Sequence, residues 1–476
     1  MVYKKPTPVL ANRGVQAGVT GEGAQPNPMQ RIVFFFTMAL VFIRFSMIHQ
    51  VQTMVMGVNL YLLYIFGVPA LLGVLATGGI ARTLRLRPGL YWTLFGVWLY
   101  IALPFSSWKG GSLPVVVTFC RTDLLMIFVI AGGAVTWSDC RRLMGAIALA
   151  ALVNLAAAQL FRRTDDYDRL HLSFGTVSNA NDYAGHMVVV LPFLLWVILS
   201  GRPVIFRIVA FLAIPYGIYV ILATASRGGL VALGVGVLYT LVVNPRLRIP
   251  VLCMAPIVFV TTVRLLPPST WQRLTSFSDT HSTGEALESA NAREYLLKTS
   301  LIYIAEHPLF GVGAGQFASY EGKSSREQGE FGMWHDTHNT FTQIACENGL
   351  PAFFFFIAGI GSSMVLLTRV YRASKDRPEC NEISVTAFCL MLAMVSFCAA
   401  IFFLNFGYFF YLPAMGGLAT CVSSAATAEF QKTAAAVPAA PSNPYWQPNV
   451  TLPQRNTHEL ILPHQTARLG RQTKLR

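Results

Sequence analysis

About twelve apolar stretches dominate this chain, and each approaches the roughly 20 residues that a helix needs to cross a bilayer. They lie at residues 31–49, 54–79, 90–106, 113–134, 142–160, 182–200, 204–222, 227–243, 249–266, 349–370, 383–404 and 406–426. The runs are continuous rather than alternating, which favours helices over the strands of a membrane barrel. We therefore expect an all-α, polytopic integral membrane protein.

Composition indicates the same class of protein. Only 12% of the 476 residues are charged and 54% are hydrophobic, whereas roughly a quarter of a soluble domain is charged. The chain has eight cysteines, but they show neither a CxxC pair nor the Cys/His spacing of a zinc site. We expect neither a disulfide framework nor a structural zinc ion.

Basic residues alternate between the loops in a way that predicts orientation. The predicted cytoplasmic loops contain Arg82, Arg85, Arg87, Arg141, Arg142, Arg202, Arg246, Arg248, Arg369, Arg372, Lys375 and Arg377. Both termini are then cytoplasmic as well, and the polar segment at 267–348 faces the other side. The net charge of +14 fits this signal and an attraction to anionic membrane lipids, so it requires no nucleic acid.

This layout divides the chain into regions. Residues 1–30 are polar and lack the apolar core of a signal peptide, so we expect a disordered cytoplasmic segment. The first nine predicted helices occupy 31–266, a large periplasmic loop occupies 267–348, the last three helices occupy 349–427, and a disordered cytoplasmic tail occupies 428–476. The large polar loop is where chemistry in water can take place.

Two arginines stand in settings suited to phosphate. Arg227 opens a glycine-rich helix in the segment Ser226–Gly229, where helix N–H groups and a guanidinium can bind an anion together. Arg293 lies in a short amphipathic helix expected on the membrane surface, within reach of headgroup phosphates. The alternatives are an Arg227 that snorkels to the interface and an Arg293 in an exposed salt bridge with Glu294 or Glu288.

His338 is the candidate general base. It lies directly before an apolar run, so a neutral imidazole at the mouth of a helix could accept a proton near pH 7. The alternative is a histidine that is structural or merely exposed. His335 and Asp336 lie close by, but no third metal ligand is obvious, so we expect no metal site.

Two further segments carry glycine or polar patterns. Gly311–Gly315 has three glycines, but no βαβ strand precedes them and no Lys-Ser/Thr follows, so we expect a tight turn rather than a nucleotide loop. Gly175–Gly185 contains Asn179 and Asn181, whose side chains could cap the next helix or hydrogen-bond a sugar.

Taken in order, these motifs resemble the O-antigen ligase and O-antigen polymerase-like membrane proteins. The resemblance rests on Gly175–Ala184, Ser226-Arg227-Gly228, His307–Phe317 with Arg293 upstream, and His338-Asn339-Thr340-Phe341 followed by Glu347-Asn348-Gly349-Leu350. It implies a membrane-type glycosyltransferase of the bacterial inner membrane, with the large loop folded as helices over a cavity.

The resemblance also implies the reaction. The donor would be a glycan on polyprenyl (undecaprenyl) diphosphate, and the acceptor a hydroxyl of lipid A–core, of a second lipid-linked repeat unit or of a protein. Transfer would take place on the periplasmic side, invert the anomeric configuration, and use neither a metal nor another cofactor.

The implied catalytic residues are three. Arg227 and Arg293 would stabilise the leaving diphosphate, and His338 would orient or deprotonate the acceptor. The expected substrate-binding residues are Asn181, Ser226, Gly228, Tyr295, Gly313, Asn339, Gln343 and Glu347.

Other functions stay open. A polysaccharide polymerase or a protein O-oligosaccharyltransferase would differ in the acceptor alone. A flippase would move the lipid-linked glycan without chemistry, but transporters place ionisable groups near the membrane midplane. Here such groups cluster in the outer loop, except Arg44, Arg121 and Asp123, which lie within predicted helices and suit either function. A structural scaffold would require neither both arginines nor His338.

Overall fold

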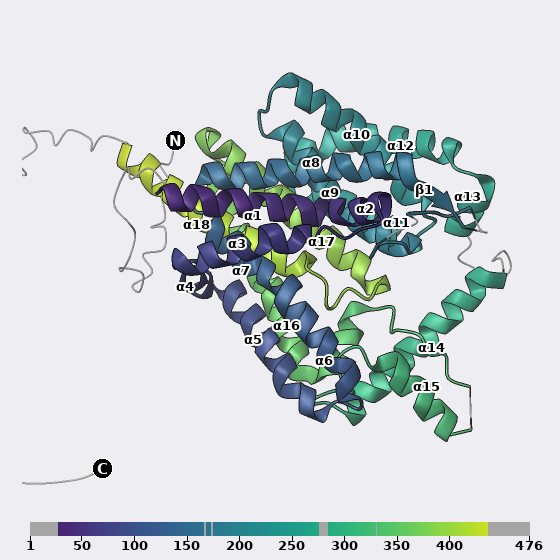
Figure 1. The fold of residues 1–476 in the computed structure, drawn as a ribbon. Coiled ribbons are helices and arrows are strands. Elements are labelled where there is room, and N and C mark those ends of the chain that lie inside the picture. The colour runs from purple at the N-terminus through teal and green to yellow at the C-terminus, as the bar shows by residue number, and fades with distance from the viewer. Residues whose placement is uncertain (1–26, 166–167, 173–174, 276–283, 330, 437–476) are drawn as a thin grey trace, which may run out of the picture. The chain divides into compact units, whose positions relative to one another are not determined.

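A computed structural model describes residues 27–165, 168–172, 175–275, 284–329 and 331–436. Met1–Phe430 form one compact unit and Gln431–Arg476 a second, of which residues 431–436 are described. The described part is predominantly helical, as predicted (Figure 1). The segments predicted to be disordered lie outside the described residues, apart from their inner ends.

The first part of the chain contains α1 (Pro28–Ser46), α2 (Ile48–Met56), α3 (Leu62–Ala76), α4 (Gly79–Leu84), α5 (Arg87–Ala102), η1 (Leu103–Phe105), α6 (Lys109–Thr118), the π-helix η2 (Phe119–Leu124), α7 (Leu125–Gly133), α8 (Trp137–Phe161), β1 (Arg162–Thr164), β2 (Leu170–Leu172), α9 (Ala180–Leu199) and α10 (Val204–Ala223). The second part contains α11 (Arg227–Val243), η3 (Pro245–Leu247), α12 (Arg248–Leu265), α13 (Pro268–Thr275), α14 (Gly284–Glu306), α15 (Phe317–Glu327), α16 (Thr340–Ser374), η4 (Pro378–Cys380), α17 (Asn381–Ala400), η5 (Ile401–Phe403) and α18 (Tyr411–Ala436).

Every predicted span overlaps helical structure, but residues 57–61 of the span at 54–79 and residues 406–410 of the last span are not helical. Within the described ranges, nine helical segments are long and apolar enough to cross a membrane. α3 and α11 are apolar but shorter. The protein is therefore a polytopic membrane protein, while the count of about twelve spans stays a prediction.

The hairpin of β1 and β2 departs from the all-α expectation. The two strands are antiparallel, with Arg163 opposite His171. Leu170 and Leu172 are buried on either side of the partly exposed His171, which is the alternation that a strand requires. Each strand has only three residues, which is too short for an alternating pattern to be recognised between the long apolar runs on either side.

The helices at both ends of the described chain extend further than predicted. α1 begins at Pro28, capped by the Asn27 side chain. α18 continues to Ala436, so the expectation of disorder from residue 428 is wrong for 428–436. This stretch contains Ala, Glu, Gln and Lys, which are strong helix formers.

Polar contacts join helices inside the bundle. α9 and α17 pack against each other, and Trp196 Nε1 donates a hydrogen bond to Thr386 Oγ1 between them at 2.9 Å. Arg44 of α1 donates to the Asp123 carboxylate of η2. The intramembrane carboxylate therefore pairs with an arginine from another helix.

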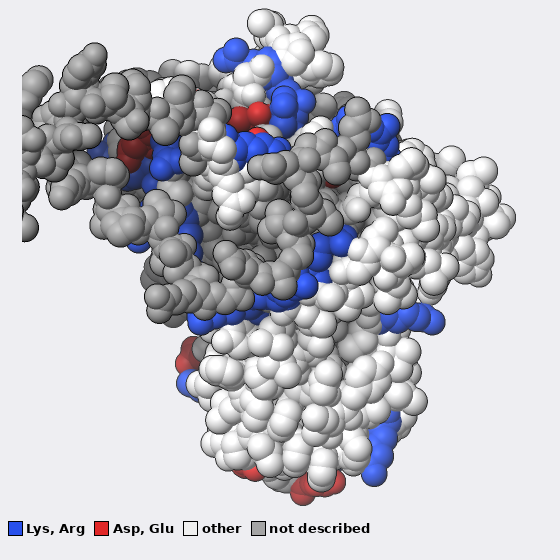
Figure 2. Space-filling view, turned by 90° about the vertical axis from the view of Figure 1, so that its left-hand side faces the viewer, with Lys and Arg blue, Asp and Glu red and all other residues white. Residues whose placement is uncertain are grey.

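Basic side chains gather at the end of the bundle where α1 begins and where α4 lies (Figures 1 and 2). This end carries Arg82, Arg85 and Arg87, which belong to the loops predicted to be cytoplasmic. α13, α14 and α15, which form the large polar loop, lie at the other end (Figure 1). The arrangement agrees with the distribution of Lys and Arg among the loops in the sequence. The side of the membrane that each end faces stays a prediction.

Candidate active site

Arg227 is the first residue of α11, and its neighbours shape the turn that presents it. Ser226 caps the helix by accepting a hydrogen bond from the Gly229 N–H at 3.2 Å. At Gly228 a Cβ atom would lie 2.8 Å from Phe403 Cβ, so only glycine lets α11 approach η5 this closely. Ser226 and Gly228, both predicted to bind substrate, thus place the backbone that carries Arg227.

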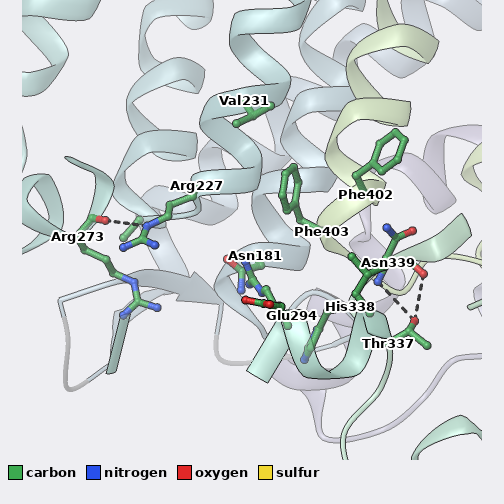
Figure 3. Close-up of a pocket in the computed structure, with 13 residues that line it drawn as sticks. Asn181, Arg227, Val231, Arg273, Glu294, Thr337, His338, Asn339, Phe402 and Phe403 are labelled. Atoms are coloured by element: carbon green, nitrogen blue, oxygen red, sulfur yellow. Dashed lines mark hydrogen bonds between the residues drawn. The ribbon is translucent and has the colours of Figure 1, made fainter. Parts of the chain in front are cut away.

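The Arg227 side chain meets the backbone of α13. Its Nε donates a hydrogen bond to the carbonyl oxygen of Arg273 at 3.1 Å (Figure 3). The side chain of Arg273 lines the same cavity as Arg227. Arg273 is not among the residues predicted from the sequence, because α13 carries no recognisable motif. The one available signal was a positive charge in the polar loop, which Arg273 shares with Arg293, Lys298, Lys323 and Arg326.

Arg293 enters from α14, which is longer than the short helix predicted for it. Burial holds the pKa of Arg293 below its ordinary value, and the charges of Arg169, Arg227 and Arg273 lower it further. Arginine remains protonated in proteins, so four cationic groups from separate segments make the site positive, with Arg169 also paired to Asp165 at 3.9 Å. Glu294 binds Lys298 at 2.6 Å, which disfavours the alternative of a salt bridge between Arg293 and Glu294.

Asn181 joins this group through Arg169. Arg169 Nη2 donates to Asn181 Oδ1 at 3.2 Å, and Arg169 Nε donates to the carbonyl oxygen of Thr224 at 3.2 Å. These bonds connect the β-hairpin to the turn before α11. Asn179 caps α9 by accepting a hydrogen bond from the Asn181 N–H at 2.8 Å, as one of the two interpretations predicted.

His338 lies directly before the cap of α16. Asn339 Oδ1 accepts hydrogen bonds from the Phe341 and Thr342 N–H groups at 2.9 and 3.3 Å. The backbone of His338 has φ 49°, a left-handed conformation that is uncommon outside glycine and asparagine. Thr337 Oγ1 donates to Asn405 Oδ1 at 3.0 Å, which holds the chain on the other side of His338.

The surroundings of His338 favour the neutral imidazole. Burial lowers the pKa of His338 and the charge of Arg293 lowers it further, while Asp336 opposes the shift. A neutral ring near pH 7 is the form that can accept a proton.

These side chains line one cavity of about 450 Å³. Its polar lining consists of Asn181, Arg227, Arg273, Arg293, Glu294, Thr337, His338 and Asn339, and its larger apolar lining residues are Val231, Leu297, Phe402 and Phe403. In Figure 3, Arg227 and Arg273 lie on one side, and His338 and Asn339 lie on the other. The volume is within the roughly 300–1,000 Å³ of small-molecule sites.

Six of the eight predicted substrate-binding residues do not line this cavity: Ser226 and Gly228, which shape the turn that presents Arg227, and Tyr295, Gly313, Gln343 and Glu347. Tyr295 OH donates to Glu321 Oε1 at 3.0 Å, and Gln343 Oε1 accepts from the Gly407 N–H at 3.2 Å. Their polar groups thus bind other parts of the protein, and their role in substrate binding stays a prediction.

Glu347 instead holds the glycine turn. Its buried carboxylate accepts from Tyr408 OH at 2.6 Å and from the Gly315 N–H at 2.9 Å. The Gly313 N–H donates to the backbone oxygen of Glu347 at 2.8 Å. Gly311, Gly313 and Gly315 all have positive φ, which confirms the predicted tight turn.

The fold and the cavity define a polytopic helical membrane protein with a cationic site in its polar loop region. Residues 208–357 match the family model described as O-antigen ligase, which confirms for this part of the chain the family that the motifs resemble. The match contains Arg227, Arg273, Arg293 and His338, whereas Arg169 and Asn181 precede it. No curated protein matches the chain significantly.

Proposed function

We propose that the protein is a glycosyltransferase that moves a glycan from polyprenyl diphosphate to an acceptor hydroxyl on the periplasmic side of the inner membrane. One observation carries the proposal: Arg227, Arg293 and His338, from three separate segments, line a single cavity. The O-antigen ligase match supports the reaction class.

The chemistry follows from these groups. The acceptor oxygen attacks the anomeric carbon, the bond from that carbon to the phosphate oxygen breaks, and its electron pair stays on the diphosphate. Arg227 and Arg293 stabilise the negative charge that develops there. His338 takes the proton of the acceptor hydroxyl. A single displacement of this kind inverts the anomeric configuration.

The lining of the cavity suits an amphiphilic donor. The guanidinium groups match the diphosphate, and the apolar side chains of Val231, Phe402 and Phe403 suit the first units of a polyprenyl chain. The acceptor hydroxyl would belong to lipid A–core, to a second lipid-linked repeat unit or to a protein.

Transfer by the purified protein in lipid vesicles tests the proposal. The vesicles receive a polyprenyl-diphosphate glycan, a metal chelator and one of three acceptors: lipid A–core, a second lipid-linked repeat unit, or a Ser/Thr peptide. We expect transfer to one acceptor, lost in His338→Ala and kept in the matched control His335→Ala, since His335 is exposed and outside the cavity lining. Movement of labelled lipid across the bilayer without transfer, equal in all variants, would establish the flippase instead.

A further inference from the structure

A second cavity, of about 200 Å³, lies inside the membrane-spanning bundle. It is lined by residues of α1, α3, η2 and α7, and α1, α3 and α7 pack against one another (Figure 1). Its polar lining residues are Arg44, Tyr64, Arg121 and Thr122. The cavity shares no lining residue with the candidate active site, so the proposed transfer reaction does not explain its two arginines.

Arg121 lies at the centre of a membrane-spanning segment. The segment Lys109–Gly133 is long and apolar enough to cross a membrane, and Arg121 is twelve residues from each of its ends. The chain forms the π-helix η2 at this point, a conformation that is frequent at functional sites. A charge at such a depth is costly unless another charge meets it. We therefore expect Arg121 to have an anionic partner.

The nearest carboxylate in sequence is already bound. Asp123 accepts hydrogen bonds from Arg44 and from Thr122 Oγ1, the second at 2.5 Å. The Arg44 and Asp123 side chains are each 12% exposed, so this ion pair is largely closed to a ligand. Two arginines and one aspartate leave one positive charge without compensation. In the described part of the chain, no acidic residue lines the cavity.

The Arg121 guanidinium is accessible from the cavity. Arg121 is exposed, and its Cζ lies 5.8 Å from the centre of the Tyr64 ring. A cation–π contact leaves the five N–H donors of the guanidinium available for hydrogen bonds. Among the described residues, no carboxylate or carbonyl oxygen accepts from Arg121. A ligand with several acceptor oxygens would meet this demand.

The rest of the cavity is apolar. It is lined by side chains of α1, α3 and α7, including Leu40, Val68, Leu71, Leu125 and Val129. Such a lining favours hydrocarbon. The ligand that complements the whole cavity is therefore an amphiphile with one anionic head and an apolar chain.

We infer that this cavity binds an anionic phospholipid, with the head-group phosphate on Arg121 and an acyl chain against α3 and α7. A guanidinium binds phosphate oxygens through paired N–H donors. The net negative charge of the lipid compensates the remaining positive charge, which a zwitterionic lipid would leave in place. The lipid is a bound component of the bilayer, neither donor nor acceptor, so the inference does not depend on the proposed function.

Native mass spectrometry of the full-length protein measures this binding. The delipidated protein in neutral detergent is titrated with phosphatidylglycerol, with phosphatidylcholine of the same acyl chains, and with polyprenyl phosphate. We expect one molecule of phosphatidylglycerol to bind more tightly than phosphatidylcholine. Arg121→Gln should weaken phosphatidylglycerol binding about 10–100-fold, as the loss of hydrogen bonds between charged groups implies. Arg121→Lys should keep part of the affinity, because the charge remains.

Two further variants separate the site from general effects. Arg264→Gln removes another exposed arginine of a membrane-spanning helix, outside this cavity, and should bind phosphatidylglycerol like wild type. Val68→Trp fills the apolar part of the cavity at a position that is 49% exposed, so it should weaken binding without a change of charge. Phosphatidylglycerol should also raise the midpoint temperature of thermal unfolding in wild type and not in Arg121→Gln.

The outcomes distinguish this inference from its alternatives. Equal binding of the two phospholipids, or equal binding of phosphatidylglycerol by Arg121→Gln and wild type, would overturn it and leave Arg121 as a side chain that snorkels to the interface. Loss of polyprenyl phosphate binding alone in Arg121→Gln would overturn it in favour of a site for the substrate lipid. Selective binding of phosphatidylglycerol through Arg121, in a protein that transfers no glycan, would support the lipid site and refute only the transferase.

Discussion

The Nε atom of Arg227 donates a hydrogen bond to the backbone carbonyl oxygen of Arg273, 3.1 Å away. Because the acceptor belongs to the backbone, this bond orients the Arg227 guanidinium whatever side chain occupies position 273. The side chain of Arg273 lines the same cavity and adds a second positive charge. The backbone at Arg273 therefore orients Arg227, while the side chain of Arg273 adds charge to the same cavity.

Arg227→Ala should reduce glycan transfer roughly 10²–10³-fold, as the loss of a group that stabilises developing charge does in other enzymes. Arg227→Lys should recover only part of the rate, since lysine keeps the charge but lacks the Nε–H that binds Arg273. Initial rates of transfer measure both effects. Thermal unfolding of each variant shows whether the fold is kept, and full activity of both variants would remove Arg227 from the mechanism.

Arg273→Ala separates charge from orientation. The backbone acceptor for Arg227 remains, so that guanidinium keeps its direction while the site loses one positive charge. We expect diphosphate affinity to fall about 10–100-fold, the equivalent of about 1.5–3 kcal/mol for one hydrogen bond to a charged group. Competition of inorganic diphosphate with the donor measures this affinity. Unchanged competition would show that Arg273 does not face the ligand.

The acid side of the pH–rate profile should report His338. Burial and Arg293 lower the pKa of His338, so the neutral base persists below the ordinary histidine value and activity falls only under more acidic conditions. Removal of the positive charge in Arg293→Gln favours the imidazolium, raises the pKa and shifts the acid limb of kcat/KM to higher pH.

Asp336→Asn should shift the same limb to lower pH, because Asp336 raises the pKa of His338. The profile of kcat/KM against pH measures both shifts, and the position of the limb is independent of the lower overall rate of the Arg293 variant. Movement of the limb in the same direction in both variants would exclude His338 as the titrating base.

Gly313→Ala should destabilise the protein by ~1–3 kcal/mol or more, since a left-handed conformation is costly outside glycine. Gly313 has φ +113°, and a Cβ there would lie 2.1 Å from Ser106 Oγ. Gly329→Ala is the matched control, with φ +80° but open space around the Cβ position. Thermal unfolding in one lipid composition compares the two, and a larger loss in the Gly329 variant would contradict the close packing at Gly313.

Glu321→Gln should loosen the segment that leads to His338. The buried carboxylate accepts hydrogen bonds from the Met333 and Trp334 N–H groups at 3.1 and 2.9 Å. An amide replaces one acceptor with a donor, which costs about 1–3 kcal/mol when a buried group loses its partner. The midpoint temperature of thermal unfolding and the transfer rate should both fall. Arg326→Gln, at an exposed position on the same helix, should change neither.

Much of the fold follows from local chemistry. Apolar runs of bilayer length predict helices wherever they occur, because hydrocarbon forces the backbone to satisfy its own hydrogen bonds. The glycine turn at Gly311–Gly315 was predicted for a similarly local reason, since positive φ favours glycine. The β1–β2 hairpin and the end of α18 were missed, because short or moderately polar segments carry weaker patterns than membrane spans.

The candidate site divides in the same way. Residue type and helix position made Arg227, Arg293 and His338 candidates, since phosphate chemistry favours arginine and proton transfer near pH 7 favours histidine, and the resemblance to a known family selected them over the structural alternatives. Only the tertiary structure brought Arg273 and Arg169 beside them and turned Tyr295, Gln343 and Glu347 toward protein partners. A side chain's partners depend on which distant segments pack against it, and local sequence carries no record of that packing.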